Sequence, residues 1–543
     1  MGLPGSGKTA VGRRLASRHG ATFIDLDDEI ERASGASVPE IFADEGEAGF
    51  RRRERAAVAA LGPADAGSAL RRVISPGGGA VVDPRNRWSL FRGRRVAWLD
   101  VRTEVIAQRL RRSPVARPLV QGPDPLGQVR ALAAARERFY AAGIRINGVA
   151  DLAGVLGQLE ALLASPASGA TALLHALTPI GEVVLGEGMA VDALDGALRR
   201  LRARRAVLVS EPGAWAAAGE GIASGLRGAG WAVEPLMLPP GEDAKRLAVI
   251  EDAARALARL RLERGEPLVA IGGGALGDPA GFLAATYARG VPWIQVPTTL
   301  VAQVDSSIGG KTAVDLPEGK NLLGAFHHPA AIVLDVALLR TLPKRQLRAA
   351  MGEIVKMAAL GDEALFAAVE ADGAAIAHGD SAAFEGGAVA EVVERAAWAK
   401  IEVVIADERE QGGATGRVAL NLGHTVAHAI EAVDGYATLM HGEAVAYGLR
   451  AATRVGTGIG VTPPERAERI ERALDRLSLG VEPLPYPPEA VVAATGTDKK
   501  RAEGRLRWVL PTADGYVTRD DIPEPPVREV VAGVLAGRGG RAT

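Results

Sequence analysis

Gly2-Leu3-Pro4-Gly5-Ser6-Gly7-Lys8-Thr9 matches the phosphate-binding loop pattern G-x-x-x-x-G-K-[ST] and runs into a helical pattern from Thr9 to Arg18. In such a loop the backbone N–H groups around Gly5 and Gly7 hold phosphates, Lys8 reaches the terminal phosphate oxygens, and Thr9 binds Mg²⁺. A glycine-rich turn without a ligand is the alternative, but the long pattern and the helix after it favour a nucleotide site. The loop alone does not separate a kinase from a GTPase or an ATPase.

The composition narrows the possible functions. The 64 Lys and Arg residues nearly balance the 65 Asp and Glu residues, so no large charge excess is available for nucleic acid or an anionic membrane. The chain has no cysteine, which excludes disulfides, thiolate catalysis and Cys-ligated zinc and leaves oxygen and imidazole as metal ligands. No apolar run approaches the roughly 20 residues that cross a bilayer, and no signal-peptide pattern opens the chain. We therefore expect a soluble, cytoplasmic protein.

A length of 543 residues predicts several domains. Short β-rich runs alternate with helical patterns in two series, which is typical of parallel α/β sheets. These runs lie at residues 22–25, 73–75, 96–100, 183–185, 206–209, 267–271, 293–296 and 332–335. Beyond Thr341 the pattern is almost entirely helical. We place a P-loop α/β domain at residues 1–164, a small-residue linker at 165–178, a Rossmann-like α/β lobe at 179–340 and a helical lobe at 341–535.

Further charged motifs follow the first loop. They are Phe23-Ile-Asp25-Leu-Asp27-Asp28-Glu29, Phe50-Arg51-Arg52-Arg53-Glu54, Gly77-Gly78-Gly79, Arg117-Pro118-Leu119, and Arg136 with Tyr140. Taken alone, Arg51 to Arg53 could form a solvated helix face. Asp25 and Asp27 could lie on opposite faces of a strand end or cap the next helix. Taken in order along the chain, the motifs resemble shikimate kinase over its whole length.

The resemblance implies ATP- and Mg²⁺-dependent phosphorylation of shikimate. Asp27 would then meet the shikimate hydroxyls, and Arg51 with Arg136 would clamp the substrate carboxylate, a geometry suited to arginine. Phosphoryl transfer depends mainly on positioning and charge neutralisation. The resemblance implies four further roles. Gly78 and Gly79 would let the backbone come close to the substrate, and Arg117 would be the lid residue that closes over the transferring phosphoryl group. Asp25 would act near Mg²⁺, and Arg109 would pack on the adenine.

One family feature is missing from the sequence. The family has a strand of about eight residues before the loop, whereas this sequence begins at the loop. We expect the true start to lie upstream. A non-catalytic nucleotide-binding module is the alternative, and the complete set of Lys8, Asp27, Arg51, Arg117 and Arg136 argues against it.

The second series carries another glycine-rich turn. Gly272-Gly273-Gly274-Ala-Leu-Gly277-Asp278 follows a predicted strand and opens a helix, which fits G-x-G-x-x-G; a plain strand-to-helix turn is the alternative. Downstream glycines and cations indicate a second phosphate or oxyanion pocket. This polar run comprises Arg289, Thr298-Thr299, Gln303 to Ser307, Gly309 to Thr312 and Gly319-Lys320-Asn321.

Histidines cluster farther along the chain. His424 and His428 are four residues apart and share a helical face, so they could chelate a metal or could simply lie on a helix surface. With Glu353, Lys356, Lys400, Asn421, Glu431, His441 and the preceding motifs, they resemble 3-dehydroquinate synthase from about Pro179 to Val530. By this resemblance Glu353, His424 and His441 bind Zn²⁺ or Co²⁺, and His428 instead handles substrate phosphate and a proton.

The resemblance also implies an NAD site and a substrate site. The NAD-side residues would be Glu242, Lys245, Gly273, Gly274, Asp278, Thr298, Thr299, Lys320 and Asn321. The substrate-side residues would be Arg289, Asp305, Lys311, Lys356, Lys400, Arg417, Asn421 and His428. The link from Gln411 to Gly416 is about three residues longer than in the family, just before Arg417.

The implied reaction converts 3-deoxy-D-arabino-heptulosonate 7-phosphate into 3-dehydroquinate and phosphate, with NAD recycled and the metal acting as a Lewis acid. Only nine of the 64 basic residues are Lys, and eight of them fall on motif positions, as expected where a compact ammonium is needed. Another sugar-phosphate cyclase or a polyol dehydrogenase is the alternative, although the phosphate-type run from Lys311 to Asn321 argues against a dehydrogenase. We expect a bifunctional enzyme acting on small molecules, dimerising through its second unit.

Overall fold

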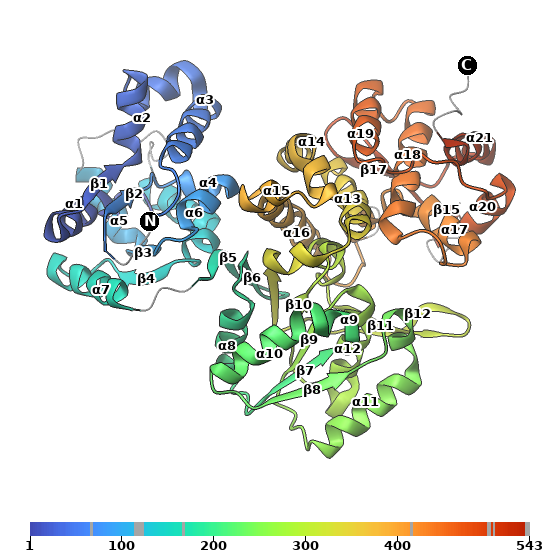
Figure 1. The fold of residues 1–543 in the computed structure, drawn as a ribbon. Coiled ribbons are helices and arrows are strands. Elements are labelled where there is room, and N and C mark those ends of the chain that lie inside the picture. Colours follow the sequence, from blue (N-terminus) through green and yellow to red (C-terminus); the bar gives the residue numbers. More distant parts are fainter. Residues whose placement is uncertain are drawn as a thin grey trace. The chain divides into compact units, whose positions relative to one another are not determined.

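The computed structural model describes residues 1–65, 69–112, 124–165, 169–412, 416–496, 501–502 and 505–537 (Figure 1). The chain forms two compact units. The first comprises Met1–Thr178 and Glu182–Ala193, and the second comprises Pro179–Gly181 and Leu194–Thr543. No described helix has the length and apolar character needed to cross a bilayer.

The first unit contains two pairs of parallel strands surrounded by helices. Strand β1 (Thr22–Asp25) pairs with β2 (Arg72–Ser75), and β3 (Ala97–Asp100) pairs with β4 (Ile144–Asn147). Its helices are α1 (Lys8–His19), α2 (Leu26–Ser34), α3 (Val38–Ala60), α4 (Pro84–Phe91), α5 (Thr103–Arg112), α6 (Pro125–Tyr140) and α7 (Leu152–Ala164). The strands β5 (Thr171–Thr178) and β6 (Gly181–Glu187) and helix α8 (Ala190–Arg200) follow.

A cavity of about 250 Å³ lies between the two strand pairs. Residues of β2 and β3 line it, together with apolar side chains of α1 and α7 such as Leu15 and Leu159. Met1 also lines the cavity; its amine donates to the Ala97 carbonyl (2.6 Å), and its own carbonyl accepts from the Leu99 N–H (2.9 Å). Burial, helped by the charge of Lys8, lowers the pKa of this amine to about 5.

The second unit is built on a parallel sheet whose strands follow the order β13-β10-β9-β7-β8. These are β7 (Ala206–Ser210), β8 (Val233–Met237), β9 (Leu268–Gly272), β10 (Trp293–Pro297) and β13 (Ala331–Asp335). Every residue of β7, β9, β10 and β13 is buried, which explains their continuous apolar runs. Helices α11 (Leu247–Arg259) and α12 (Gly274–Thr286) pack their apolar faces on the sheet (Figure 1).

The strand order places a topological switch point between β7 and β9. From β7 the chain moves outward to β8 on one side, and from β9 it moves to β10 and β13 on the other. In open parallel sheets ligands bind in the crevice at the carboxyl ends of the strands at such a point. Glu211 follows β7 and Gly273 follows β9, so both lie at this crevice.

Helices dominate the rest of the unit. They are α9 (Pro212–Ala214) and α10 (Glu220–Gly228) within the sheet region, then α13 (Lys344–Ala359), α14 (Glu363–His378), α15 (Ser381–Glu385), α16 (Ala388–Ala406), α17 (His424–Asp434), α18 (His441–Gly458), α19 (Pro464–Arg476), α20 (Pro488–Thr495) and α21 (Glu524–Leu535). Antiparallel hairpins join β11 (Lys311–Leu316) to β12 (Gly319–Phe326), β14 (Arg501–Ala502) to β15 (Arg505–Leu506), and β16 (Trp508–Pro511) to β17 (Tyr516–Arg519).

The expected α/β class with a helical second lobe is confirmed. All eight strand runs expected from the sequence correspond to strands. The hairpin β11–β12 was not expected, because the run from Gln303 to Asn321 was interpreted only as a pocket. The sequence left Asp25 and Asp27 either at a strand end or as caps of the next helix; β1 ends at Asp25, which caps α2, and Asp27 lies in the first turn of α2.

Candidate active sites

The phosphate-binding loop leads directly into helix α1. Gly5 and Gly7 have φ values of 81° and 97°, a region that favours glycine, and Gly7 caps the helix. The Lys8 ammonium donates to the carbonyls of Gly2 (2.9 Å) and Leu3 (3.0 Å). Arg109 approaches the loop from α5, with Nη1 3.4 Å from the carbonyl oxygens of Gly5 and Ser6.

Thr9 and Asp25 meet beside this loop. The Thr9 hydroxyl donates to Asp25 Oδ2 at 2.7 Å, and Asp25 Oδ1 accepts from the Asp27 N–H at 3.2 Å. Asp25 therefore caps α2, as one reading of the sequence expected, and also places a carboxylate next to the Thr9 hydroxyl. A hydroxyl and a carboxylate are oxygen ligands of the kind that Mg²⁺ prefers.

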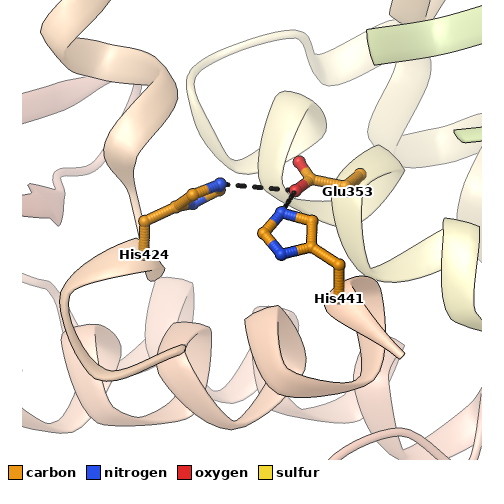
Figure 2. A group of neighbouring side chains, drawn as sticks. All are labelled: Glu353, His424 and His441. Carbon is orange, nitrogen blue, oxygen red and sulfur yellow. Dashed lines mark ion pairs between the residues drawn. The ribbon is translucent and has the colours of Figure 1, made fainter. Parts of the chain in front are cut away.

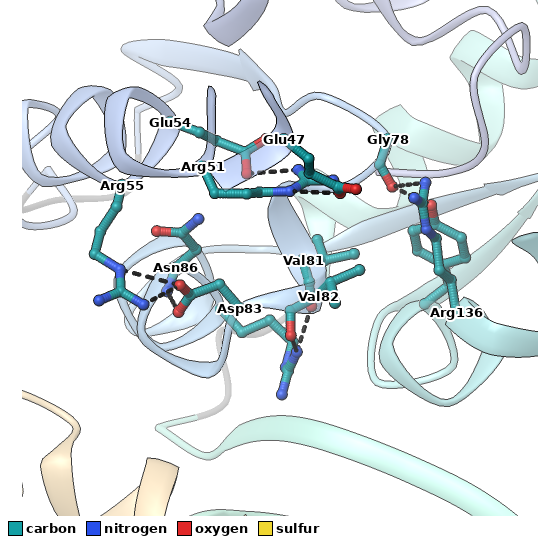
Figure 3. A network of polar contacts seen from close by, with 12 residues as sticks. Glu47, Arg51, Glu54, Arg55, Gly78, Val81, Val82, Asp83, Asn86 and Arg136 are labelled. Carbon is teal, nitrogen blue, oxygen red and sulfur yellow. Dashed lines mark hydrogen bonds and ion pairs between the residues drawn. The ribbon is translucent and has the colours of Figure 1, made fainter. Parts of the chain in front are cut away.

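Arg51, Arg136 and Asp27 converge on the glycine run Gly77–Gly79, and Figure 3 shows Arg136 beside Gly78. Arg136 Nη1 donates to the Gly78 carbonyl at 2.8 Å. A Cβ atom at Gly79 would come within 2.6 Å of the Arg51 guanidinium, and one at Gly77 within 2.7 Å of Asp27 Oδ1. The absence of side chains on these glycines therefore lets the charged groups reach the backbone.

Of the three consecutive arginines, Arg51 is the least exposed. Its side chain is 25% exposed against 72% for Arg52, and its Nη1 lies 2.8 Å from Oε2 of the buried Glu54 (Figure 3). Burial raises the pKa of Glu54 although Arg51 opposes the shift. A plain solvated helix face does not describe Arg51. Arg117, the expected lid residue, lies outside the described residues.

Glu353, His424 and His441 come together from three helices (Figure 2). Glu353 Oε1 lies 3.4 Å from His424 Nε2 and 3.0 Å from His441 Nε2. His424 begins α17, His441 begins α18, and Glu353 lies in α13. Burial opposes the charged form of His441, but its bonds to Glu353 and Glu431 outweigh burial and raise its pKa to about 10. His428 lies next to the group, with its ring centroid 5.2 Å from that of His424.

Each of these three residues is adjacent in sequence to a glycine whose backbone contacts another part of the helical lobe. A Cβ atom at Gly352 would overlap the Gly442 carbonyl, and one at Gly442 would overlap the Ala349 carbonyl, so α13 and α18 touch through their backbones. A Cβ atom at Gly448 of α18 would likewise overlap the Gly423 carbonyl, which precedes His424. The contacts that set the helix spacing therefore adjoin the three clustered side chains.

A buried chain of charges extends from Glu353. Lys356 Nζ lies 2.5 Å from Glu353 Oε2 and 3.7 Å from Asp305 Oδ1, and Lys400 Nζ lies 2.6 Å from the same Asp305 atom. The two acids outweigh burial and raise the pKa of Lys356. Burial and the Lys356 charge lower the pKa of Lys400 although Asp305 opposes the shift.

Arg417 lies buried near the start of the hairpin β11–β12. Its side chain donates to the Gly309 carbonyl (2.8 Å), and its Nε and Nη1 have no hydrogen-bond partner among the described residues. Lys311, two residues after Gly309, is exposed and lies 2.5 Å from Glu410. Asn421 ends the turn that leads to α17. Arg289 is exposed in a turn after α12, so no contact brings it to this group within the described residues.

The crevice at the switch point holds a cavity of about 380 Å³. Gly273, Thr298 and Thr299 line it, with Gly273 capping α12. A Cβ atom at Gly274 would come within 2.8 Å of Ser306 Oγ. Glu211, which the sequence analysis missed, also lines the cavity, and its carboxylate accepts from the N–H groups of Gly213 (2.8 Å) and Ala214 (2.7 Å). Its position directly after a buried strand was the available signal.

The remaining residues expected at the NAD side form two ion-paired groups beside the crevice. Lys245 Nζ lies 2.8 Å from Asp278 Oδ2 and 3.2 Å from Asn321 Oδ1. Lys320 Nζ lies 3.1 Å from Glu242 and 4.2 Å from the Tyr436 ring centroid. Both groups connect the hairpin β11–β12 with the segment between β8 and α11 through side-chain contacts.

Family models match the sequence of both units. A model described as shikimate kinase matches residues 4–147, and the N- and C-terminal models of 3-dehydroquinate synthase match residues 235–349 and 350–501. A 3-dehydroquinate synthase of Caulobacter vibrioides is 41% identical over 352 residues, which are 62% of this chain and 92% of that protein. The chain belongs to the 3-dehydroquinate synthase family. A shikimate kinase domain precedes the synthase domains in the sequence. The expected fusion and its two enzyme classes are confirmed.

Other relatives agree with this assignment. The 3-dehydroquinate synthase of Symbiobacterium thermophilum is 43% identical over 59% of this chain and 88% of its own length. Among solved structures, ValA (2-epi-5-epi-valiolone synthase) of Streptomyces hygroscopicus subsp. jinggangensis, with NAD⁺ and Zn²⁺ bound, is 26% identical. The match covers 65% of this chain and 96% of that one with a TM-score of 0.59. The 3-dehydroquinate synthase unit thus shares its fold with the 2-epi-5-epi-valiolone synthase.

Proposed function

We propose that the chain is a bifunctional enzyme of aromatic precursor biosynthesis. Its first unit would phosphorylate shikimate with ATP and Mg²⁺. Its second unit would convert 3-deoxy-D-arabino-heptulosonate 7-phosphate into 3-dehydroquinate and phosphate, with NAD and Zn²⁺ or Co²⁺. The observation that carries the second assignment is that the group Glu353, His424 and His441 adjoins the buried cations Lys356 and Lys400.

The residues present fit a divalent metal. Two imidazole nitrogens and a carboxylate oxygen lie within 4.8 Å of one another, and the chain contains no thiolate that would compete. Glu353 is 1% exposed, and its two oxygens are directed at the two imidazoles and at Lys356. Glu353, His424 and His441 would hold the ion, which when bound supplies a Lewis acid for the hydroxyl to be oxidised.

The switch-point crevice fits a dinucleotide. Gly273 and Gly274 let backbone N–H groups at the start of α12 approach a pyrophosphate, and the helix dipole favours an anion there. NAD would supply the hydride acceptor. Lys400 donates to Asp305, and the ammonium of Lys356 would keep Glu353 charged. The ammonium groups of Lys356, Lys311 and Lys400 would hold the phosphate and carboxylate of the substrate.

The first unit provides the parts of a phosphoryl transferase. Lys8 and the loop glycines would hold the nucleotide phosphates, and Thr9 with Asp25 would hold Mg²⁺. Arg51 and Arg136 would bind the shikimate carboxylate, with Asp27 at its hydroxyls and Arg109 at the adenine. Glu54 would hold the Arg51 guanidinium in place through the 2.8 Å contact between Arg51 Nη1 and Glu54 Oε2.

Two assays on the full chain test the proposal. Shikimate should promote ADP formation, and the heptulosonate phosphate should release phosphate with NAD present in catalytic amount only. Stoichiometric accumulation of NADH from a polyol would instead indicate a dehydrogenase. Preference for a heptulose phosphate without a carboxylate would indicate another cyclase. Dimerisation through the synthase unit stays a prediction.

Arg417 is expected to bind an anionic group of the substrate, because its buried guanidinium keeps Nε and Nη1 unpaired within the described chain. Arg417→Met should raise the KM for the heptulosonate phosphate about tenfold or more and leave NAD binding unchanged. Steady-state kinetics and NAD titration measure the two effects. Arg409→Met is the control, since Arg409 is exposed on the preceding turn. An unchanged KM in Arg417→Met would contradict the assignment.

Glu211 is expected to select NAD over NADP. Its fixed carboxylate lies after β7, where an acid accepts from the ribose 2′-hydroxyl and repels a 2′-phosphate. Glu211→Ser retains a helix cap but removes the charge, so the preference for NAD over NADP should fall roughly tenfold. Fluorescence titration with both nucleotides gives this ratio. The same ratio in variant and wild type would remove Glu211 from the cofactor site.

A further inference from the structure

Glu431 holds the outer nitrogen of His441. Glu431 lies in α17, seven residues after His424 and on the same helical face. Its Oε1 lies 2.9 Å from His441 Nδ1, while the other ring nitrogen of His441 points to Glu353 at 3.0 Å. The Glu431 side chain is only 10% exposed, so its position is fixed by packing.

The two imidazoles of the cluster are held differently. His424 is 11% exposed, and its Nδ1 lies 3.1 Å from the Leu422 carbonyl, so packing and backbone orient the ring. His441 is 39% exposed, so less packing restrains its ring. The contact with Glu431 is therefore the main restraint that turns Nε2 of His441 toward Glu353.

The segment between these residues is itself anchored. The Asp434 carboxylate accepts from the N–H groups of Ala437 (2.9 Å) and Thr438 (2.7 Å), and Arg345 Nη2 donates to the Thr438 carbonyl (2.7 Å). Arg345 also binds Glu443 in the first turn of α18 with both its Nε and Nη2. The backbone of His441 is thus placed independently of Glu431, which leaves the ring torsion and the tautomer to Glu431.

We propose that Glu431 is a positioning residue that fixes the orientation and the Nδ1–H tautomer of His441 for a divalent metal. The inference rests on the proposed metal centre and assigns no ligand role to Glu431. A carboxylate behind a metal-binding imidazole keeps the metal-facing nitrogen unprotonated and raises its basicity. One face of α17 would thus supply His424 as a ligand and, through Glu431, orient His441 as a second ligand.

Zinc affinity of the full chain tests the proposal without any assay of activity. Competition with a chromophoric chelator would be measured on metal-stripped wild type, Glu431→Leu, Glu431→Gln and His441→Ala, and on the double variant of Glu431→Leu with His441→Ala. Glu391→Gln controls for loss of a buried acid, because Glu391 pairs with Arg395. Glu353→Gln removes the charge of the proposed carboxylate ligand, so a loss of zinc affinity in this variant shows that zinc binds at the proposed metal centre.

Glu431→Leu should weaken zinc binding about 10- to 100-fold, and Glu431→Gln less, since an amide oxygen still accepts from Nδ1–H. In the His441→Ala background the leucine substitution should add no further loss. Wild-type affinity in Glu431→Leu, or an equal loss in both backgrounds, would overturn the positioning role.

The absorption spectrum of the Co²⁺-loaded chain separates positioning from ligation. An unchanged coordination number in Glu431→Gln supports the proposal, whereas a lost ligand would show that Glu431 binds the metal, together with His428 and His441. If wild type and Glu353→Gln bound zinc equally weakly, the metal centre of the proposed function would fail, and this inference with it.

Discussion

Gly442→Ala is expected to abolish zinc binding and phosphate release by the 3-dehydroquinate synthase unit while shikimate-dependent ADP formation continues. A Cβ atom at this position would overlap the Ala349 carbonyl, so α18 and α13 would have to separate. These helices carry His441 and Glu353, and metal ligands tolerate displacements of only a few tenths of an ångström. A misplacement of about 1 Å costs a catalytic site roughly 100-fold in rate.

The chain offers a matched control on the same helix. Gly458 ends α18, and a Cβ atom there would meet nothing within 4 Å. Gly458→Ala should therefore retain zinc and activity. The kinase activity of each variant reports whether the first unit has folded, and the far-ultraviolet circular dichroism of the full chain reports whether the second unit keeps its helices. Full zinc affinity in Gly442→Ala would contradict this prediction, because it would show that α13 and α18 can shift without moving the three side chains.

An apolar extension of about five residues before Met1 is expected to stabilise the first unit and increase its kinase activity. Strands β2 and β3 line the cavity between the two strand pairs, and Met1 already hydrogen bonds with β3. Extended residues continuing from Met1 would run along both strands and fill this space. Each apolar side chain buried there contributes about 1.5–3 kcal/mol before the cost of ordering the extension is subtracted.

Calorimetry of the full chain would measure this effect as a rise of several degrees in the transition of the first unit. An extension of equal length made of serine and glycine is the control and should add little. Shikimate-dependent ADP formation should rise with the apolar extension alone. If both extensions left the transition and the activity unchanged, the cavity would have no structural consequence.

Local patterns predicted much of this fold. The buried strands of the second unit are continuous apolar runs, and the two glycine-rich turns open helices at Lys8 and Gly274 as expected. The hairpin β11–β12 escaped prediction because Lys311, Lys320 and Asn321 were interpreted by their chemistry, while strand pairing depends on partners fixed only in the folded chain.

The metal cluster shows where sequence spacing stops being informative. Helical spacing joined His424 to His428, but the structure groups His424 with Glu353 and His441, which lie on other helices. Only the family resemblance had suggested that set. Glu431 and the contact glycines were missed as well, because their effect depends on helix packing and not on neighbours in the chain.

The cluster spans a long stretch of chain, from residue 353 in α13 to residue 441 in α18. An ion held there would close this stretch into a loop and so reduce the conformational freedom of the unfolded chain, as a disulfide does. A protein without cysteine would thereby obtain a reversible cross-link, and the packing of three helices in its second unit would follow the supply of metal in the cell.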